Sequence, residues 1–301
     1  MRILCFIFIL LLTFGCQKSV TPEQQAVDHA RAAYEASPSR SSADSLIMAL
    51  EAFVETNGYA DSTSARYMLK AARLSAEYRH PMQTRALYRS YFVAYPDRPN
   101  QADLLAEYIT LSENLRMTEI NDVLYKSFIK RFPEDQRAEA FQTKIMMPEM
   151  TVDSFVRYSG RNMFNDSTFR LDIPKAKVYV EIAQDMVMTD PGIPRADEYL
   201  HHAAETCRTL RDVHKAIDLY DWIIDSYPTG DRAATALFLK AFTLDNDLKQ
   251  YEKAGEQYKY FIDLYPDNEF TESAQFLLDN LGRSEEELKK KLEENAKNNV
   301  E

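Results

Sequence analysis

The sequence predicts an all-α fold in which antiparallel helix pairs stack side by side as an α-solenoid. Three observations lead to this prediction: glycine is scarce, proline marks a period of almost forty residues, and apolar residues recur at helical spacing within each period. The chain has 301 residues and only 7 glycines. Average usage would give roughly 21. Rossmann folds, phosphate loops, nucleophile elbows and β-sandwiches need glycine for tight turns, so the composition argues against all four.

The period is marked by an aromatic residue followed by proline. Pro96, Pro133, Pro228 and Pro266 each follow Tyr or Phe at the end of an apolar-periodic stretch. The first two prolines are 37 residues apart and the last two are 38 residues apart. Such a period is the signature of stacked helix pairs, and proline ends the second helix of each pair.

Each period contains the residue types that a tight helix pair needs. Small residues let the two helices approach to about 8–10 Å, and an aromatic residue four positions after the second small residue fills the groove. In the last unit the first helix carries Leu237, Ala241 and Leu244, and the second carries Ala254, Tyr258 and Phe261. The same positions recur at Tyr199, Ala203, Thr206, Ala216, Tyr220 and Ile223; at Tyr67, Ala71, Leu74, Thr84, Tyr88 and Tyr91; and at Leu104, Tyr108, Leu111, Asn121, Tyr125 and Phe128.

These positions resemble the tetratricopeptide repeat (TPR). The strongest matches are Ala254, Tyr258 and Pro266, and Ala216, Tyr220 and Pro228. The chain departs from the pattern at Lys240, His202 and Tyr108. The segment from Tyr251 to Asn268 is similar to BamD-like and YbgF-like envelope lipoproteins of Gram-negative bacteria, and the segment from Ala274 to Leu288 to TPR lipoproteins common in Bacteroidota. The resemblance implies a TPR-like superhelix with a concave groove that binds peptides or proteins, and no enzymatic activity.

The first fifteen residues are typical of a secretory signal peptide. One cation, Arg2, precedes a ten-residue apolar run from Ile3 to Leu12, which is too short to span a bilayer as a helix. Gly15-Cys16 at its end resembles a bacterial lipobox, although Phe14 is bulkier than the pattern prefers. The resemblance implies cleavage after residue 15 and acylation of Cys16 with palmitate-type chains. An ordinary signal peptide with an incidental cysteine is the alternative.

The rest of the chain divides by pattern. A linker, 16–21, precedes the solenoid, 22–283, and a charged helix or tail occupies 284–301. Helices are expected near 22–36, 42–56, 62–78 and 175–188. Turn-forming residues interrupt the period over 148–173, which we interpret as an irregular insertion or as one distorted repeat with a long loop.

The sequence contains few residues in a pattern suited to catalysis or metal binding. Glu198, His201, His202 and Glu205 share a helical spacing. Adjacent histidines point about 100° apart on a helix, so we expect no metal site, and no cofactor. Cys207 is the remaining cysteine of an exported chain and is expected to act as a small apolar filler.

Candidate partner-binding residues lie on the first helix of the last unit. In a TPR groove the positions between the core residues face the bound peptide, and the resemblance places Thr235, Phe238, Phe242 and Asp245 there. Phe238 and Phe242 are suited to anchor a peptide. The competing interpretation, which we favour, is that they pack against the neighbouring helix pair.

The predicted function is a lipid-anchored, non-enzymatic scaffold that binds envelope proteins or peptides, in outer-membrane protein assembly or envelope organisation. Gln17-Lys18-Ser19 contains no acidic residue of the kind that resembles surface-export signals, which favours an outer-membrane lipoprotein facing the periplasm. A formal net charge of −11 argues against nucleic-acid binding. The alternatives are a glycan- or peptide-binding lipoprotein of a nutrient uptake system, and a hydrolase with its site in 148–173, where Asp153, Asp166 and Asp172 lie.

Overall fold

A computed structural model of the chain describes residues 21–59, 62–96, 98–283 and 287. Within these residues the regular structure is helical, apart from one isolated β-bridge between Phe164 and Leu171. The helices are α1 (Pro22–Ala36), α2 (Arg40–Asn57), α3 (Ser62–Glu77), α4 (Pro81–Ala94), α5 (Gln101–Asn114), α6 (Thr118–Arg131), α7 (Arg137–Gln142), α8 (Val152–Asn162), α9 (Ile173–Thr189), α10 (Ala196–Thr209), α11 (Val213–Ser226), α12 (Ala233–Asn246), α13 (Tyr251–Leu264) and α14 (Thr271–Asp279). The predicted all-α fold class is confirmed.

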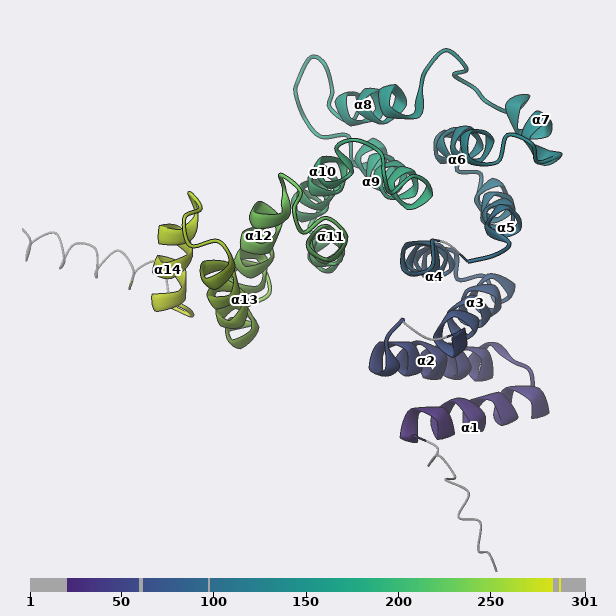
Figure 1. Cartoon of the computed structure of the whole chain (residues 1–301), viewed down its shortest axis with the longest axis horizontal. Coiled ribbons are helices and arrows are strands. Elements are labelled where there is room, and N and C mark those ends of the chain that lie inside the picture. The colour runs from purple at the N-terminus through teal and green to yellow at the C-terminus, as the bar shows by residue number, and fades with distance from the viewer. Residues whose placement is uncertain (1–20, 60–61, 97, 284–286, 288–301) are drawn as a thin grey trace, which may run out of the picture. The chain divides into compact units, whose positions relative to one another are not determined.

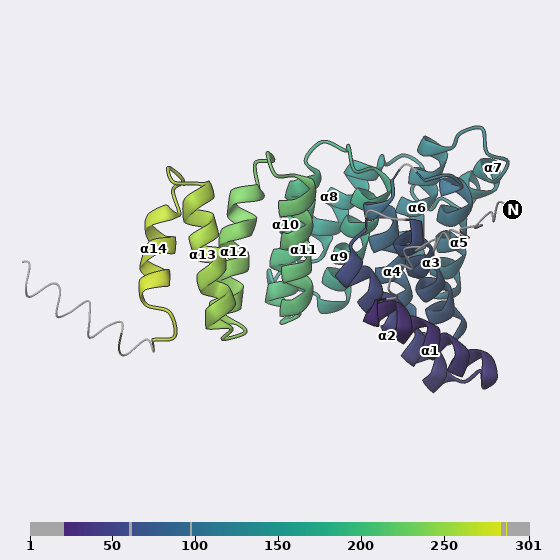
Figure 2. The same ribbon diagram turned by 60° about the horizontal axis from the view of Figure 1, so that its bottom comes forward.

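The chain separates into two compact units, Met1–Tyr91 and Phe92–Glu301. The first unit contains α1 to α3 and most of α4 (Figure 1). There α1 packs against α2, and α2 packs against α3. In the second unit α10 to α14 stand side by side in chain order, each packed against the next (Figure 2).

The four predicted repeat units coincide with four helix pairs: α3 with α4, α5 with α6, α10 with α11, and α12 with α13. The small residues expected at the close crossings, including Ala203, Ala241 and Ala254, are completely buried. The aromatic residues expected in the grooves are buried as well, namely Tyr88, Tyr125, Tyr220 and Tyr258. Helix pairs with tetratricopeptide spacing are therefore the building blocks of the fold.

At the corners inside these pairs, residues other than glycine adopt the left-handed backbone conformation. The backbone turns left-handed at Arg79, Arg116, Arg211 and Lys249, with φ between 56° and 64°. At three of these corners the next N–H bonds back to the carbonyl five residues earlier, as Asp212 does to Cys207 at 2.9 Å. This bond closes the C-terminus of the first helix. Cationic residues thus occupy positions that glycine would adopt at lower conformational cost.

The first two helices begin at side-chain caps. The Thr21 hydroxyl accepts a hydrogen bond from the Gln24 backbone N–H at 3.2 Å, and Pro22 is the first helical residue, as expected. The second helix was expected from residue 42 but begins at Arg40. The reason is a reciprocal cap in which Ser39 and Ser42 each bond the other's backbone N–H.

The period breaks after α6. The short helix α7 and then α8 follow, and α6 packs against α7, α8 and α9. Helix α9 also packs against α8 and α10, and it is buried on every side from Tyr179 to Thr189. Helix α9 begins two residues before the expected 175–188 helix and ends one residue after it. The earlier start has a local cause, because Asp172 accepts a hydrogen bond from the Lys175 N–H at 3.2 Å and Pro174 lies in the first turn.

Several sequence predictions lie outside the described residues. They are the signal peptide 1–15, the cysteine proposed for lipidation, Cys16, most of the linker, and the tail 284–301 apart from Glu287. In the part of the chain that is described, no helix combines the length and the apolarity needed to cross a bilayer.

Cys207 lies in α10 and is 1% exposed, with its thiol free. Burial raises the pKa of this thiol to about 12, so it stays protonated at neutral pH. The residue therefore fills space in the core, as the sequence analysis expected.

Candidate functional site

A cavity lies in the second unit, where the repeat period fails. It has a volume of about 660 Å³ and is bounded by α8, the loop 163–172, α9 and α10. Its lining combines apolar, charged and hydroxyl side chains: Ser154, Val156, Arg157, Gly160, Arg161, Met163, Phe164, Leu171, Tyr179, Arg195, Glu198, Tyr199, His202, Glu205, Thr206 and Thr209.

Helix α8 forms one wall because its sequence is strongly amphipathic. Thr151 caps its N-terminus by accepting a hydrogen bond from the Ser154 N–H at 3.1 Å. Phe155 and Val156 are the buried side chains. At Gly160 an added Cβ would lie 3.0 Å from the Tyr179 ring, so the absence of a side chain allows α8 to approach α9 at this point.

The loop 163–172 forms a second wall and has a hairpin-like structure. The Asp172 N–H donates to the Met163 carbonyl at 2.8 Å, and the Asn165 N–H donates to the Arg170 carbonyl at 2.9 Å. The Asn165 side-chain oxygen accepts hydrogen bonds from the N–H groups of Ser167 and Thr168 at 3.1 and 2.9 Å. These bonds fix a loop that carries Met163, Phe164 and Leu171 to the cavity.

Helix α10 supplies a charged edge whose charges are paired. Arg195 binds Glu198 in a bidentate fashion, with N···O distances of 2.5 and 2.6 Å. Chiefly through these hydrogen bonds, Arg195 lowers the pKa of Glu198 to about 2. Glu205 accepts a hydrogen bond from the Tyr220 hydroxyl and lies 3.6 Å from Arg208. Both carboxylates are therefore already occupied.

The polar side chains at the opposite edge of the cavity also have partners within the protein. Arg157 lies 2.5 Å from Asp153, which also accepts a hydrogen bond from the Tyr199 hydroxyl. Burial, followed by this hydrogen bond, raises the pKa of Tyr199 to about 12. The hydroxyls of Thr206 and Thr209 donate to carbonyls within α10, at 2.7 and 2.9 Å.

These contacts determine what the cavity can bind. Its floor is formed by Val156, Leu171, Tyr179 and neighbouring apolar groups, while most polar groups on its edges already have partners in the protein. An apolar group gains from leaving water at such a site, whereas a ligand rich in hydroxyls would find few unpaired donors or acceptors.

The histidine cluster singled out in the sequence separates on α10. The His202 Nε2 lies 3.6 Å from Glu198 at the edge of the cavity. His201 is 9% exposed, and burial lowers its pKa, which favours the neutral ring. Among the described residues, no group of three or more His, Cys, Asp or Glu side chains is arranged to hold a metal ion.

The four residues predicted to bind a partner lie on α12. Phe238 is 9% exposed and stacks on Phe270, the residue that precedes α14, with ring centroids 4.9 Å apart. Phe242 is half-buried, and the Arg208 guanidinium lies 5.4 Å from its ring centre. Phe238 therefore packs against the start of the next helix, α14, and also against aromatic rings of α13.

The other two predicted residues differ in burial. Asp245 is 8% exposed and accepts a 3.5 Å hydrogen bond from the Tyr258 hydroxyl, so it faces the inside of the α12–α13 pair. Burial raises the pKa of Asp245. Thr235 is half-buried. A binding role for Thr235 and Phe242 stays a prediction.

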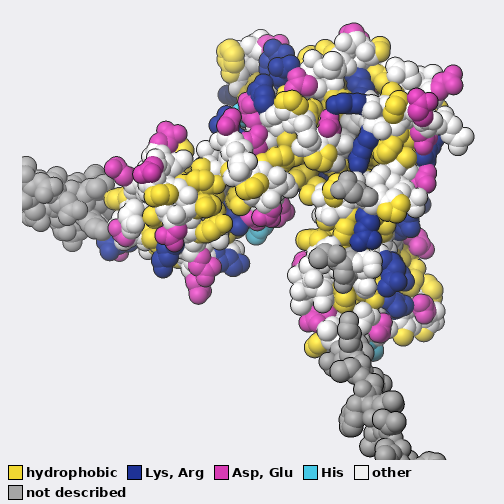
Figure 3. Space-filling model, in the orientation of Figure 1, with side chains coloured by type: hydrophobic (Ala, Val, Ile, Leu, Met, Phe, Trp, Pro, Cys, Tyr) yellow, Lys and Arg dark blue, Asp and Glu magenta, His cyan; other side chains and the backbone are white. Residues whose placement is uncertain are grey.

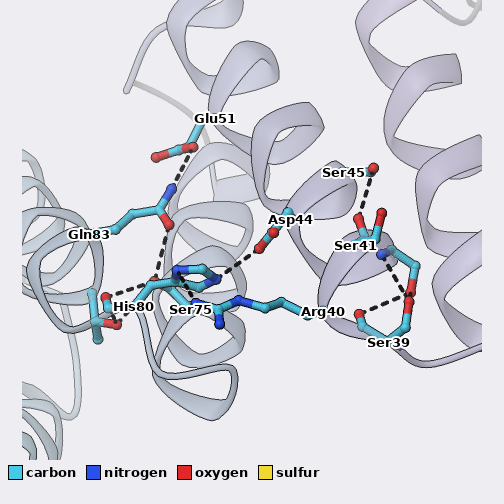
Figure 4. Close-up of polar contacts among 11 residues, drawn as sticks. Ser39, Arg40, Ser41, Asp44, Ser45, Glu51, Ser75, His80 and Gln83 are labelled. Atoms are coloured by element: carbon cyan, nitrogen blue, oxygen red, sulfur yellow. Dashed lines mark hydrogen bonds and ion pairs between the residues drawn. The ribbon is translucent and has the colours of Figure 1, made fainter.

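The first unit contains Ser, His and Asp side chains close together, and their geometry is not that of a nucleophilic site (Figure 4). The His80 Nε2 lies 2.9 Å from Asp44, and its Nδ1 lies 3.3 Å from Arg40. Because arginine only donates, Nδ1 is the acceptor and Nε2 carries the proton toward Asp44. The Ser75 hydroxyl donates to the His80 carbonyl instead of the ring. Both ring nitrogens are thus used to join α2 to the corner before α4.

The acids of the hydrolase alternative do not converge either. Asp153 pairs with Arg157 and Tyr199, and Asp172 caps α9. Asp166 is exposed on the loop. Two of the three carboxylates therefore have structural roles.

The sequence indicates both walls of the cavity, as the irregular segment 148–173 and as the helix face with Glu198, His202 and Glu205. Nothing in the spacing of these residues indicates that the two walls meet. The break in the repeat period is the feature of the sequence that could have indicated a cavity. A helix that no longer follows the repeat does not cover the surface of its neighbour completely.

Comparisons with known proteins give matches among solved structures. No protein-family model matches the sequence. No curated protein matches it. Among solved structures, the chain is similar to the TPR2AB-domain:pHSP90-complex of yeast Sti1, with 14% identity and a TM-score of 0.31 over 85% of this chain and 95% of that one. At this identity and TM-score the likeness carries no argument about function.

Proposed function

We propose that this protein is a lipid-anchored scaffold of a Gram-negative envelope that binds a segment of another envelope protein. The cavity between α8, the loop 163–172, α9 and α10 is the observation that carries the proposal. Repeat arrays bind through surfaces that their helices present, and a cavity of about 660 Å³ is large enough for bulky apolar side chains.

The lining favours a peptide over a glycan. Sugars are bound through hydrogen bonds to their hydroxyls, yet the carboxylates of Glu198 and Glu205 and the hydroxyls of Thr206 and Thr209 are already engaged. An apolar side chain of a partner needs only the floor, with Val156, Leu171 and Tyr179 around it. This favours protein binding over the glycan-capture alternative.

Anchoring and location form the second part of the proposal. Acylation of Cys16 would hold the chain on the outer membrane, and the neutral-to-basic Gln17-Lys18-Ser19 favours the periplasmic side. A scaffold in this place is suited to outer-membrane protein assembly or to organisation of the envelope. BamD-like and YbgF-like lipoproteins are the families that the sequence resembles.

Site-specific photocrosslinking in intact cells tests the binding surface. A photoreactive amino acid at Thr209, which is exposed at the cavity edge, is compared with one at Lys253, which is exposed on α13. We expect a discrete protein adduct from position 209 alone, and its loss when Thr206→Phe fills the cavity in a chain whose melting temperature is retained. Equal adducts from both positions, or an adduct that survives Thr206→Phe, would contradict the proposed binding site.

The anchor is tested separately with Cys16→Ser. We expect the substituted chain to lose incorporation of an alkyne-labelled fatty acid and to leave the membrane fraction. Unchanged labelling and fractionation would refute the anchor while leaving the cavity proposal standing.

A further inference from the structure

Exposed apolar side chains concentrate around α8 and the loop that follows it. Twelve large hydrophobic residues in the described chain are exposed, and five of them lie in the 28 residues 146–173. These five are Met146, Tyr158, Phe164, Phe169 and Ile173. In Figure 3 hydrophobic, cationic and acidic side chains lie next to one another near the top of the picture, left of its centre, where Figure 1 places the loop between α8 and α9.

Phe169 is the most exposed of them, at 82%. It occupies the left-handed region with φ of 53°, which is uncommon for a bulky side chain. Its N–H donates to the Asn165 carbonyl at 2.8 Å, within the same loop whose turn the Asn165 side chain stabilises. The ring is thus presented to solvent by an ordered turn, at a conformational cost.

Four exposed cations lie in the same segment as this ring, and their side chains have no partner among the described residues. Between residues 161 and 177 the chain has four cations, Arg161, Arg170, Lys175 and Lys177, against two carboxylates, Asp166 and Asp172. All four cationic side chains are exposed, and none forms a hydrogen bond or ion pair with another described residue. A local charge of +2 in a chain with a net charge of −11 is complementary to an anionic surface.

We propose that the segment 161–177, which we term the α8–α9 tip, inserts Phe169 into an anionic phospholipid surface while its four cations contact the lipid phosphates. Aromatic rings and cations on one projecting element are the combination that binds the membrane interface, where the ring leaves water and the cations meet anionic headgroups. Phe169 does not line the cavity proposed to bind a partner segment, so its ring is available for a separate contact. This contact is additional to the proposed anchor and does not depend on it.

Vesicle partitioning of an unlipidated chain tests the proposal. The probe is the chain from residue 16 with Cys16→Ser, mixed with vesicles of phosphatidylcholine containing 30% phosphatidylglycerol or none. We expect partitioning onto the anionic vesicles only, weakened about tenfold by Phe169→Ser. Each of Arg161→Gln and Arg170→Gln should weaken it about fivefold at low salt. Phe276→Ser, which removes a 41% exposed ring from α14, is the matched control and should change nothing.

Tryptophan fluorescence locates the ring directly. The chain has one tryptophan, Trp222, so Trp222→Phe combined with Phe169→Trp gives a single reporter in the tip. We expect a blue shift and protection from iodide quenching on anionic vesicles, and neither for a reporter at position 276. A reporter at 169 that remains quenchable, or partitioning that survives Phe169→Ser, would overturn the proposal. Shielding of the reporter by a purified protein in the absence of lipid would overturn it as well.

Discussion

The regular pairs α10–α13 and the irregular pair α8–α9 solve the same packing problem with different results. In the regular pairs, small residues such as Ala203 and Ala241 draw the helices together, and Tyr220 and Tyr258 fill the remaining groove. In the irregular pair, Gly160 provides a close approach, and a ten-residue loop replaces the corners of three and four residues in the regular pairs. The cavity and the exposed tip both lie in the irregular pair. A regular repeat buries apolar surface between its helices. Where the repeat breaks down, apolar surface stays exposed and is available for binding.

The largest expected effect comes from removing a groove-filling ring in each region. Tyr220→Ala, at a fully buried position, should lower the free energy of unfolding by about 3–5 kcal/mol. Tyr179→Ala should cost less, about 2 kcal/mol, because one side of its ring already borders the cavity and has fewer contacts to lose. Urea denaturation of both variants measures the difference, and equal losses would mean that the two regions are packed alike.

A smaller effect is expected from crowding the close approach of α8 and α9. Gly160→Val would place its Cβ about 3.0 Å from the Tyr179 ring and should cost about 1–3 kcal/mol. It should also abolish the photoadduct from position 209, because α8 is displaced at the cavity wall. Gly192→Val is the control, since no atom lies within 4 Å of an added Cβ there. If both variants melt at the same temperature, the approach of α8 to α9 is not constrained as described.

Positive φ angles offer a gain in stability in another regular pair, α5–α6, as well as in the irregular pair. Arg116→Gly, in the corner between α5 and α6, should raise the free energy of unfolding by about 0.5–1 kcal/mol, because glycine adopts φ of 56° without steric cost. Phe169→Gly should give a similar gain at φ of 53° while abolishing lipid binding. Thermal melts and vesicle partitioning together distinguish the two. A loss of stability in Phe169→Gly would show that the ring packs within the protein.

The smallest effect concerns the charged edge of the cavity. Because Arg195 lowers the pKa of Glu198 to about 2, the ion pair stabilises the fold above about pH 4.5, and this contribution is lost as the pH falls toward 2. The ion pair lies at the surface, with the Arg195 side chain 51% exposed and that of Glu198 25% exposed, so Glu198→Gln should cost less than about 1 kcal/mol at pH 7. Near pH 2 the substitution should cost nothing. Glu252→Gln, in the first turn of α13 and without an ion pair to any described residue, is the reference; a cost for Glu198→Gln that is independent of pH would argue against the pairing.

The order of the helices can be predicted from the sequence because it depends on contacts between neighbouring segments of the chain. Alanine and tyrosine at fixed spacing, with a proline at the end, specify contacts between neighbours in sequence, and such contacts recur wherever the pattern recurs. The caps at Thr21 and Ser39 are local in the same sense, although the reciprocal bond that moved the start of α2 to Arg40 was missed. The left-handed corners at Arg116 and Arg211 gave no signal, because side-chain identity there does not report φ.

The helix pairs, their chain order and the place where the period stops can be predicted from the amino-acid sequence, since each depends on residues within about forty positions of one another. Three features required the folded structure: α9 is buried on every side, Phe238 stacks on Phe270, and α8 and the loop 163–172 meet α10 around a cavity. Those outcomes depend on which surfaces meet once the repeat register is lost. No periodic pattern encodes that choice.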